Sequence, residues 1–277
     1  MKYFLHPIFF ILFGLLIGCT EKLDDKSLDN TITVTYIANE GFLLESNGKK
    51  VLIDALFKTG LDRYAYPDSV LLTEMVSGNP PFDNIDYLMF THNHPDHYND
   101  SLTYNFLLNH SETILICPSQ INTQLINYQT LEPEIEKRIV AVTPDSGRVK
   151  TRAFQEFEFT ACRTSHGDTY DIENNAYIIN FGGVKVFHSG DSWKDALLEW
   201  NGIELKKDSI DLAMVNGFYA GDGYELLNER IAPKEIILIH MKNEHLDMFT
   251  NIMAEDTAVF YNSTLFKESM QSKTYNF

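Results

Sequence analysis

Two stretches of the chain carry apolar runs on either side of a tight-turn pair. Residues 42–54 contain two such runs around Asn-Gly, and residues 176–187 contain two around Gly-Gly. Either pair between β-rich runs is typical of a short hairpin turn. The sequence therefore predicts two β-hairpins, and the second strand of each leads to an aspartate, Asp54 in the first and Asp191 in the second.

Shorter apolar runs predict further strands, and helical patterns lie between the strands. The strands are expected at 85–90, 157–161 and 236–240, and the helices at 101–110, 120–128, 193–200 and 224–230. Two similar halves, each with a hairpin and helices, predict an α/β fold in which two mixed sheets face each other and helices cover their outer faces. This architecture is an αββα sandwich.

One large domain accounts for most of the chain. Of the 277 residues, 44% are hydrophobic, and no linker rich in Pro, Gly or Ser divides the middle. The candidate ligands described below span positions 92–240, so a cut between them would split the site. We expect a single domain over 31–277, preceded at 19–30 by a flexible acidic and polar tether without aromatic residues.

Residues 1–18 form a candidate export signal. Lys2 precedes an apolar stretch at 8–17, which is too short for a comfortable membrane span and typical of the core of a signal peptide. Leu16-Ile17-Gly18-Cys19 is similar to a bacterial lipobox. This resemblance implies cleavage before Cys19, lipidation of that cysteine and a lipid-anchored protein of the bacterial cell envelope. An uncleaved signal anchor and an ordinary buried cysteine are the alternatives.

The chain is strongly acidic, with a formal net charge of −17, which becomes about −18 when the single positive charge of Lys2 leaves with the signal. A domain this acidic repels nucleic acid unless it carries a local basic groove. The sequence shows no Lys/Arg cluster of that kind. We therefore expect a small molecule or a lipid as substrate and no nucleic acid partner.

The densest chemistry follows the predicted strand at 85–90. His92, His94, Asp96 and His97 lie within six positions. Imidazole and carboxylate bind divalent first-row metals, and two His at i, i+2 can converge on one ion while the Asp-His pair turns toward another. The spacing predicts two metal ions on the loop at the carboxyl end of a strand, where α/β folds usually bind ligands.

A closed two-metal site needs two or three further donors. Three candidates each follow a predicted strand: His166, Asp191 and His240. A lone His after a strand is more often a hydrogen-bonded structural residue than a ligand. The order of the donors along the chain is what favours a metal site.

This order resembles the metallo-β-lactamase superfamily of metallohydrolases, from about Thr31 to His245. The Thr-His-x-His-x-Asp-His and Ser-Gly-Asp forms are most similar to the branch with ascorbate-phosphate lactonases and N-acyl-phosphatidylethanolamine phospholipase D. The resemblance implies the αββα sandwich and two divalent ions, Zn²⁺ first, with Mn²⁺ or Fe²⁺ as alternatives. The family pattern assigns His92, His94 and His166 to one ion, Asp96, His97 and His240 to the other, and Asp191 to the bridge between them.

The same resemblance implies a hydroxide held between the ions as nucleophile, with Asp96 as the catalytic residue that orients this water and carries its proton. Asp54 is similar to the family's carboxylate that accepts the other N–H of a ligating His, although a turn-forming role is the alternative. His188 either points into the site or is structural.

The implied reaction is hydrolysis of a phosphodiester or a phosphorylated lactone. Candidate phosphate contacts are Lys194, Arg163 and Lys242, and candidate pocket residues are Tyr219 and Tyr224. The alternatives are a non-catalytic, metal-containing surface lipoprotein that binds a ligand, and iron redox chemistry. The diiron oxygen-reducing relatives typically carry Glu at the position of His94, so this chain departs from their pattern.

Two cysteines remain after Cys19, namely Cys117 and Cys162. In an oxidising envelope they could form a disulfide, and they could equally be two buried thiols in strands. The sequence leaves both possibilities open.

Overall fold

The computed structural model describes Met1 and residues 29–167, 169–192, 205–207, 209–217 and 223–277. Cys19, the rest of the predicted signal after Met1, most of the predicted tether and the predicted helix at 193–200 lie outside the described residues.

The first of two seven-stranded sheets has the strand order β14-β1-β2-β3-β4-β5-β6. The strands β1, β2 and β3 pair antiparallel with one another, and β3 to β6 run parallel. The strand bounds are Thr31–Ala38 (β1), Gly41–Ser46 (β2), Lys49–Ile53 (β3), Tyr87–Met89 (β4), Ile114–Cys117 (β5), Ile139–Ala141 (β6) and Ser272–Asn276 (β14).

The second sheet has the order β13-β12-β11-β10-β9-β8-β7. Here β7 to β10 pair antiparallel, and β10 to β13 run parallel. The strand bounds are Val149–Phe154 (β7), Phe157–His166 (β8), Thr169–Asn180 (β9), Lys185–His188 (β10), Leu212–Asn216 (β11), Glu235–Ile239 (β12) and Ser263–Leu265 (β13).

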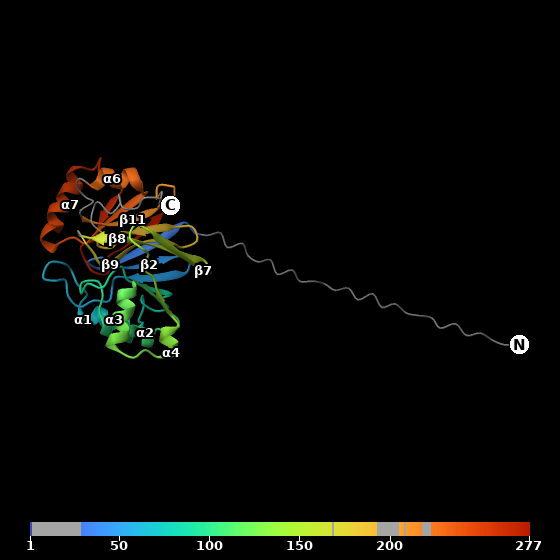
Figure 1. The fold of residues 1–277 in the computed structure, drawn as a ribbon. Coiled ribbons are helices and arrows are strands. Elements are labelled where there is room, and N and C mark those ends of the chain that lie inside the picture. The colour runs from blue at the N-terminus through green and yellow to red at the C-terminus, as the bar shows by residue number, and fades with distance from the viewer. Residues whose placement is uncertain (2–28, 168, 193–204, 208, 218–222) are drawn as a thin grey trace.

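Helices cover the outer face of each sheet, as Figure 1 shows. Apolar residues of α1, α2 and α3, such as Met75 and Phe106, pack on the first sheet, and Leu227 of α6 packs on the second. The helix bounds are Ser69–Ser77 (α1), Asp100–Asn109 (α2), Ser119–Tyr128 (α3), Pro133–Glu136 (α4), Gly223–Arg230 (α6), Asn243–His245 (the 3-10 helix η2) and Leu246–Glu255 (α7).

The central core fills the space between the sheets. Phe42 and Val51 of the first sheet share one buried cluster with Phe159 and Tyr177 of the second. Burying an aromatic or branched side chain stabilises the fold by about 1.5–3 kcal/mol. The expected αββα sandwich of two mixed sheets is confirmed.

Both predicted hairpins are present, as β2–β3 and β9–β10. Asn47 and Gly48 have φ of 50° and 74°, and Gly182 has φ of 80°, which is the left-handed backbone that favours Asn and Gly in such turns. The predicted helices at 101–110, 120–128 and 224–230 match α2, α3 and α6 to within one residue at each end. The sequence patterns did not reveal α1, α7 or the edge strand β14.

Cys117 and Cys162 lie in β5 and β8, on different sheets, and both are buried without a disulfide. In the part of the chain that the structure describes, no helix has the length and apolar composition needed to cross a bilayer.

Candidate metal centre

The predicted ligands meet at one edge of the sandwich, because parallel strands end at the same edge of a sheet. In the first sheet, β3 leads to Asp54 and the neighbouring β4 leads to the loop that begins at Thr91. In the second sheet, β10 leads to Asp191 and β12 to His240, while His166 is the last residue of β8. Asp54 and His240 have φ of 45° and 53°, a costly backbone for a non-glycine residue and one that is concentrated at functional sites.

Seven predicted ligand side chains form two adjoining groups. In each group the nitrogen and oxygen atoms that could bind an ion all lie within 4.8 Å of one another. One group is His92, His94, His166 and Asp191, and the other is Asp96, His97 and His240. Asp191 Oδ2 lies 2.9 Å from His166 Nε2 in the first group and 3.8 Å from His240 Nε2 in the second. Asp191 therefore stands between the two groups.

Asp54 holds the imidazoles of the first sheet in place. Its Oδ1 accepts a hydrogen bond from the Thr91 amide at 2.8 Å, and its Oδ2 accepts one from Thr91 Oγ1 at 2.5 Å. His97 Nδ1 donates to the same Oδ2 at 3.1 Å. Because Nδ1 of His97 carries that proton, Nε2 keeps its lone pair for an ion when the ring is neutral.

Thr91 extends this control to His92. Its hydroxyl proton goes to Asp54, so the oxygen can accept from His92 Nδ1, which lies 3.0 Å away. The Nε2 of His92 is then the free acceptor, as for His97. Burial, with the neighbouring His97 next in importance, holds the pKa of His92 well below its ordinary value, so its ring is neutral as a metal ligand must be.

A close backbone contact brings the loops of the two sheets together. Gly190 has φ of 54°, and a Cβ there would lie 2.9 Å from Asn174 Oδ1 and 3.0 Å from Thr91 Cβ. The Asn175 amide also donates to the Thr91 carbonyl at 2.9 Å. The glycine of the Ser-Gly-Asp segment is thus required for Asp191 to approach the histidine loop.

Asp96 is 3% exposed, and its Oδ2 faces both histidines of its group, 3.6 Å from His240 Nε2 and 3.7 Å from His97 Nε2. Asn39, in the turn between β1 and β2, donates from Nδ2 to the Asp96 carbonyl at 3.2 Å and to Oδ2 at 3.4 Å. These bonds hold the carboxylate toward the interior of the centre.

His188 is structural in this arrangement. Its Nε2 lies 3.2 Å from the Glu40 carbonyl, which can only accept, and its Nδ1 accepts from the Gly190 amide at 3.1 Å. Both ring nitrogens are therefore engaged, with the proton on Nε2. His188 ties the β1–β2 turn to the loop of Asp191 and has no nitrogen left for an ion.

Glu40 belongs to the same centre, although the sequence patterns did not identify it. Its side chain is fully buried, and Oε2 lies 3.7 Å from His97 Nδ1. Burial raises the pKa of Glu40 well above its ordinary value; His97 opposes this shift, and Asp191, Asp54 and Asp96 add to it. Glu40 lies between β1 and Gly41 as a single acidic residue, and no motif in the sequence around it indicated a ligand or a catalytic residue.

The carboxylates of the centre stabilise positive charge near its histidines. Burial would lower the pKa of His97, but its hydrogen bond to Asp54 and the charges of Glu40 and Asp96 raise that pKa to about 10. Burial would likewise raise the pKa of Asp191, but His166 and His240 hold it below its ordinary value. A cation bound at His97 Nε2 would replace the proton there.

The unsatisfied atoms fit metal ions. Nε2 of His92, His97 and His240 are buried and have no hydrogen-bond partner among the described residues. Buried polar atoms are nearly always paired, so a set of unpaired imidazole nitrogens that lie close together calls for an ion. Imidazole nitrogen and carboxylate oxygen are the donors of zinc, manganese and iron sites.

A cavity of about 460 Å³ opens beside His240. It is lined by Arg63, Tyr64, Gly217, His240, Met241, Lys242, His245, Met248 and Phe249. The Tyr64 ring packs 4.2 Å from the His240 ring, centroid to centroid, and burial followed by the charge of Asp191 raises the pKa of its hydroxyl. The cavity therefore adjoins His240, one member of the second group of ligands.

The residues predicted to contact the substrate lie in different parts of the structure. Lys242 lines the cavity, whereas Arg163 lies within β8 and does not. Tyr224 donates its hydroxyl to Asn262 at 3.1 Å and packs on Phe260, and it is not among the described residues that line this cavity. Lys194 and Tyr219 lie outside the described residues.

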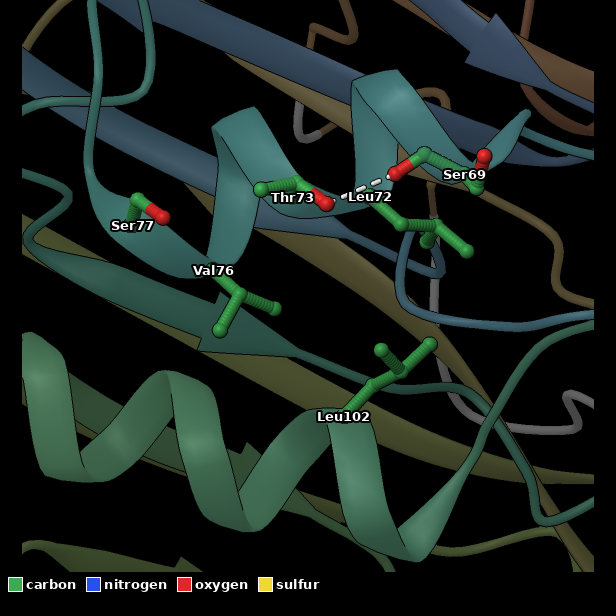
Figure 2. A pocket seen from close by; sticks show the side chains of 6 residues that line it. All are labelled: Ser69, Leu72, Thr73, Val76, Ser77 and Leu102. Carbon is green, nitrogen blue, oxygen red and sulfur yellow. Dashed lines mark hydrogen bonds between the residues drawn. The ribbon is translucent and has the colours of Figure 1, made fainter.

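A second cavity, of about 300 Å³, lies between α1 and α2 on the outer face of the first sheet. Figure 2 shows its lining, in which Thr73 donates to the Ser69 carbonyl at 2.8 Å. Its side chains are Ser69, Leu72, Thr73, Val76, Ser77 and Leu102. None of these residues titrates near neutral pH or is a strong metal ligand, so this cavity adds nothing to the site.

Known proteins resemble this chain over most of its length. The model of the beta-lactamase superfamily domain matches residues 33–237. A UPF0173 metal-dependent hydrolase of Archaeoglobus fulgidus is 25% identical over 211 residues, which cover 75% of this chain and 82% of that protein. A metal-dependent hydrolase of Heliobacterium modesticaldum is 26% identical over 193 residues, covering 66% of this chain and 69% of the relative.

Solved structures share the fold at low sequence identity. The metallo-beta-lactamase fold protein YhfI of Bacillus subtilis superposes with a TM-score of 0.60 at 18% identity, over 89% of this chain and 100% of that chain. An isothiocyanate hydrolase from Delia radicum gut bacteria gives a TM-score of 0.60 at 13% identity, over 88% of this chain and 99% of the other.

Proposed function

The chain belongs to the beta-lactamase superfamily domain family, and on that premise we propose that this metal-dependent hydrolase binds two divalent ions and cleaves a phosphodiester or a phosphorylated lactone. The observation that carries the proposal is the pair of adjoining donor groups with Asp191 between them. When bound, divalent ions lower the pKa of a coordinated water toward neutrality and polarise the oxygen of the substrate bond.

The residues of the first sheet prepare the centre for these ions. Asp54 fixes the proton of His97 on Nδ1, and Thr91 places His92 in the same way. Outer partners of this kind typically change metal affinity by about 10–100-fold. His92 and His97 therefore present Nε2 to the ions without rearrangement.

Asp96 is the residue that we assign to proton transfer. Its Oδ1 is buried and has no hydrogen-bond partner among the described residues, while Oδ2 faces the two histidines of its group. One carboxylate oxygen is thus available to take a proton from the attacking water and pass it to the leaving oxygen. Such general acid–base catalysis contributes about 10²–10⁴-fold.

The cavity supports an anionic substrate. Arg63 and Lys242 line it, and none of the described residues that line it is Asp or Glu, although the chain carries 39 acidic residues against 22 Lys and Arg. Among the described residues, no carboxylate lies within ion-pair distance of Lys242. A phosphate oxygen is a suitable partner for both cations, and Met248 and Phe249 could contact an apolar part of the substrate.

The test is hydrolysis of bis(p-nitrophenyl) phosphate by protein loaded with Zn²⁺ or Mn²⁺, with Asp96→Asn as the control and a phosphorylated lactone as the second substrate. We expect turnover of at least one substrate, and a loss of about 10²–10⁴-fold in kcat/KM in Asp96→Asn. Melting temperatures of both proteins, measured in parallel, show that the variant is folded. Metal-loaded protein that turns over neither substrate would contradict the proposed reaction and favour a metal-containing binding protein.

A further inference from the structure

The turn between β1 and β2 brings Glu40 into the metal centre. Asn39 has φ of 49°, and a Cβ on Gly41 would lie 2.7 Å from the Asp54 carbonyl oxygen, so only glycine allows this approach. His188 Nε2 donates to the Glu40 carbonyl at 3.2 Å, which holds the turn from the second sheet. The position of Glu40 is therefore fixed by both sheets.

The carboxylate of Glu40 lies close to His240 of the second group and to Asp191. One of its oxygens, one Asp191 oxygen and one His240 nitrogen all lie within 4.8 Å of one another, which is the same condition that the predicted ligands satisfy. Its Oε2 is also 3.7 Å from His97 Nδ1, although that nitrogen is already bonded to the closer Asp54. Glu40 thus adjoins one residue assigned to the second ion and the residue assigned to the bridge. It also forms a group with Asp54 and His188, but Asp54 accepts from Thr91 and His97, and both ring nitrogens of His188 are engaged.

Neither oxygen of Glu40 has a hydrogen-bond partner among the described residues, and the side chain is 0% exposed. A carboxylate is costly to bury without a partner, and proteins compensate by pairing it, protonating it or binding a cation. The nearby donor His97 Nδ1 gives its hydrogen bond to the closer Asp54. A cation bound by the donor atoms around His240 would compensate the charge of Glu40.

We propose that Glu40 supplies a carboxylate oxygen to the ion held by Asp96, His97 and His240, as an additional ligand of the second metal site. This inference rests on the proposed two-ion centre. It makes the two sites chemically different. The first site has three imidazoles and the shared Asp191, whereas the second has two imidazoles, Asp96, Glu40 and the shared Asp191.

The difference predicts different metal preferences. Carboxylate-rich sites suit Mn²⁺ and similar oxygen-preferring ions, and imidazole-rich sites suit Zn²⁺. We therefore expect the second site to hold Mn²⁺ or Fe²⁺ better than the first does when both metals are supplied.

The experiment compares metal binding by wild type, Glu40→Gln and the matched control Glu45→Gln. Glu45 lies on β2 of the same hairpin, partly exposed, and pairs with Lys50 at 3.6 Å. Calorimetric titration of metal-free protein with Mn²⁺ and with Zn²⁺ gives two affinities, and elemental analysis gives the stoichiometry. The melting temperature of each metal-free protein is measured alongside.

We expect wild type and Glu45→Gln to bind two ions with the same affinities. Glu40→Gln should lose at least about 10-fold in affinity at one site, more for Mn²⁺ than for Zn²⁺, and keep the other site. Its metal-free melting temperature should stay close to that of wild type, because Gln has the same shape and removes no hydrogen bond.

Two results would overturn the assignment of Glu40. One is unchanged affinity at both sites, and the other is an equal loss at both sites with a lower metal-free melting temperature, which would mean a structural role. Both leave the two-ion centre of the wild type intact. Wild type that binds no divalent ion would instead refute the proposed function itself.

Discussion

The two sheets contribute to the metal centre in different ways. The first sheet brings four ligand-type side chains from one loop after β4, and the second sheet brings three from the ends of three strands. The side chains of His92 and His97 are 0% exposed, whereas those of Asp191 and His166 are 16% and 20% exposed. One half is a compact motif in which His94 alone is partly exposed, and the other half is assembled by topology, with Asp191 and His166 more exposed than His240.

The ligands of the two sheets also differ in their hydrogen-bond partners. Asp54 and Thr91 form a continuous network behind His92 and His97 that exists without any ion. On the second sheet, Asp191 Oδ2 has His166 and His240 as its close neighbours, at 2.9 and 3.8 Å. We therefore expect changes in the first half to affect folding and metal binding together, and changes in the second half to act mainly on metal binding.

The largest expected effect is that of Asp54→Ala. This change leaves the Thr91 amide, the Thr91 hydroxyl and His97 Nδ1 without their buried acceptor. Removing one partner from a buried charged network costs about 3–5 kcal/mol. Urea unfolding of the metal-free protein should show this loss in the free energy of unfolding. A loss below about 1 kcal/mol would show that the network does not preorganise the centre.

Asp191→Asn should give the next largest effect, and this effect should be a loss of metal affinity. Asp191, a carboxylate that adjoins both donor groups, loses its charge. At least one metal affinity should therefore fall by about 100-fold or more, beyond the cost of losing an outer partner. Elemental analysis after dialysis should then find fewer ions per protein. If both ions are retained with unchanged affinity, Asp191 does not bridge them.

The same contrast explains what the sequence could predict. The loop after β4 could be predicted as a metal site because its donors lie within six positions. The hairpins could be predicted because Asn-Gly and Gly-Gly favour the left-handed backbone of a tight turn. The donors of the second sheet are single residues, and only their order along the chain pointed to them. The structure brings all seven together at one edge, while their roles as ligands stay a prediction.

Other features depend on contacts that no local pattern records. Glu40 follows an ordinary β-rich run. It reaches the metal centre because Gly41 packs on Asp54, a residue that is distant along the chain. Tyr64 lies in a loop and reaches His240 only through the fold. The strand β14 is polar and mostly exposed, so its sequence lacks the apolar alternation that reveals an inner strand.

Thr91→Val tests the reach of the first-sheet network with a smaller change. The side chain keeps its shape but loses the hydroxyl that links Asp54 to His92. Leaving a buried donor or acceptor unpaired costs about 1–3 kcal/mol, so unfolding should show a loss in that range. His92 would also lose its orienting partner, and the affinity of the first site should fall by about 10-fold. An unchanged metal affinity would limit the network to His97.

The smallest expected effect is that of Lys242→Ala, on the second-sheet side of the cavity. Lys242 follows β12, lines the cavity beside His240 and has no carboxylate within ion-pair distance among the described residues. A partly buried cation that contacts a substrate phosphate contributes modestly, so KM for an anionic substrate should rise by about 3- to 10-fold, or roughly 1 kcal/mol. The free energy of unfolding and the metal content should stay at wild-type values, because Lys242 contacts no ligand. A steady-state comparison with Lys267→Ala gives the control, because Lys267 is an exposed cation outside the cavity lining that pairs with Asp247 at 3.0 Å. If KM rises equally in both variants, the effect is one of overall charge, and the second-sheet half would supply metal ligands without binding the substrate.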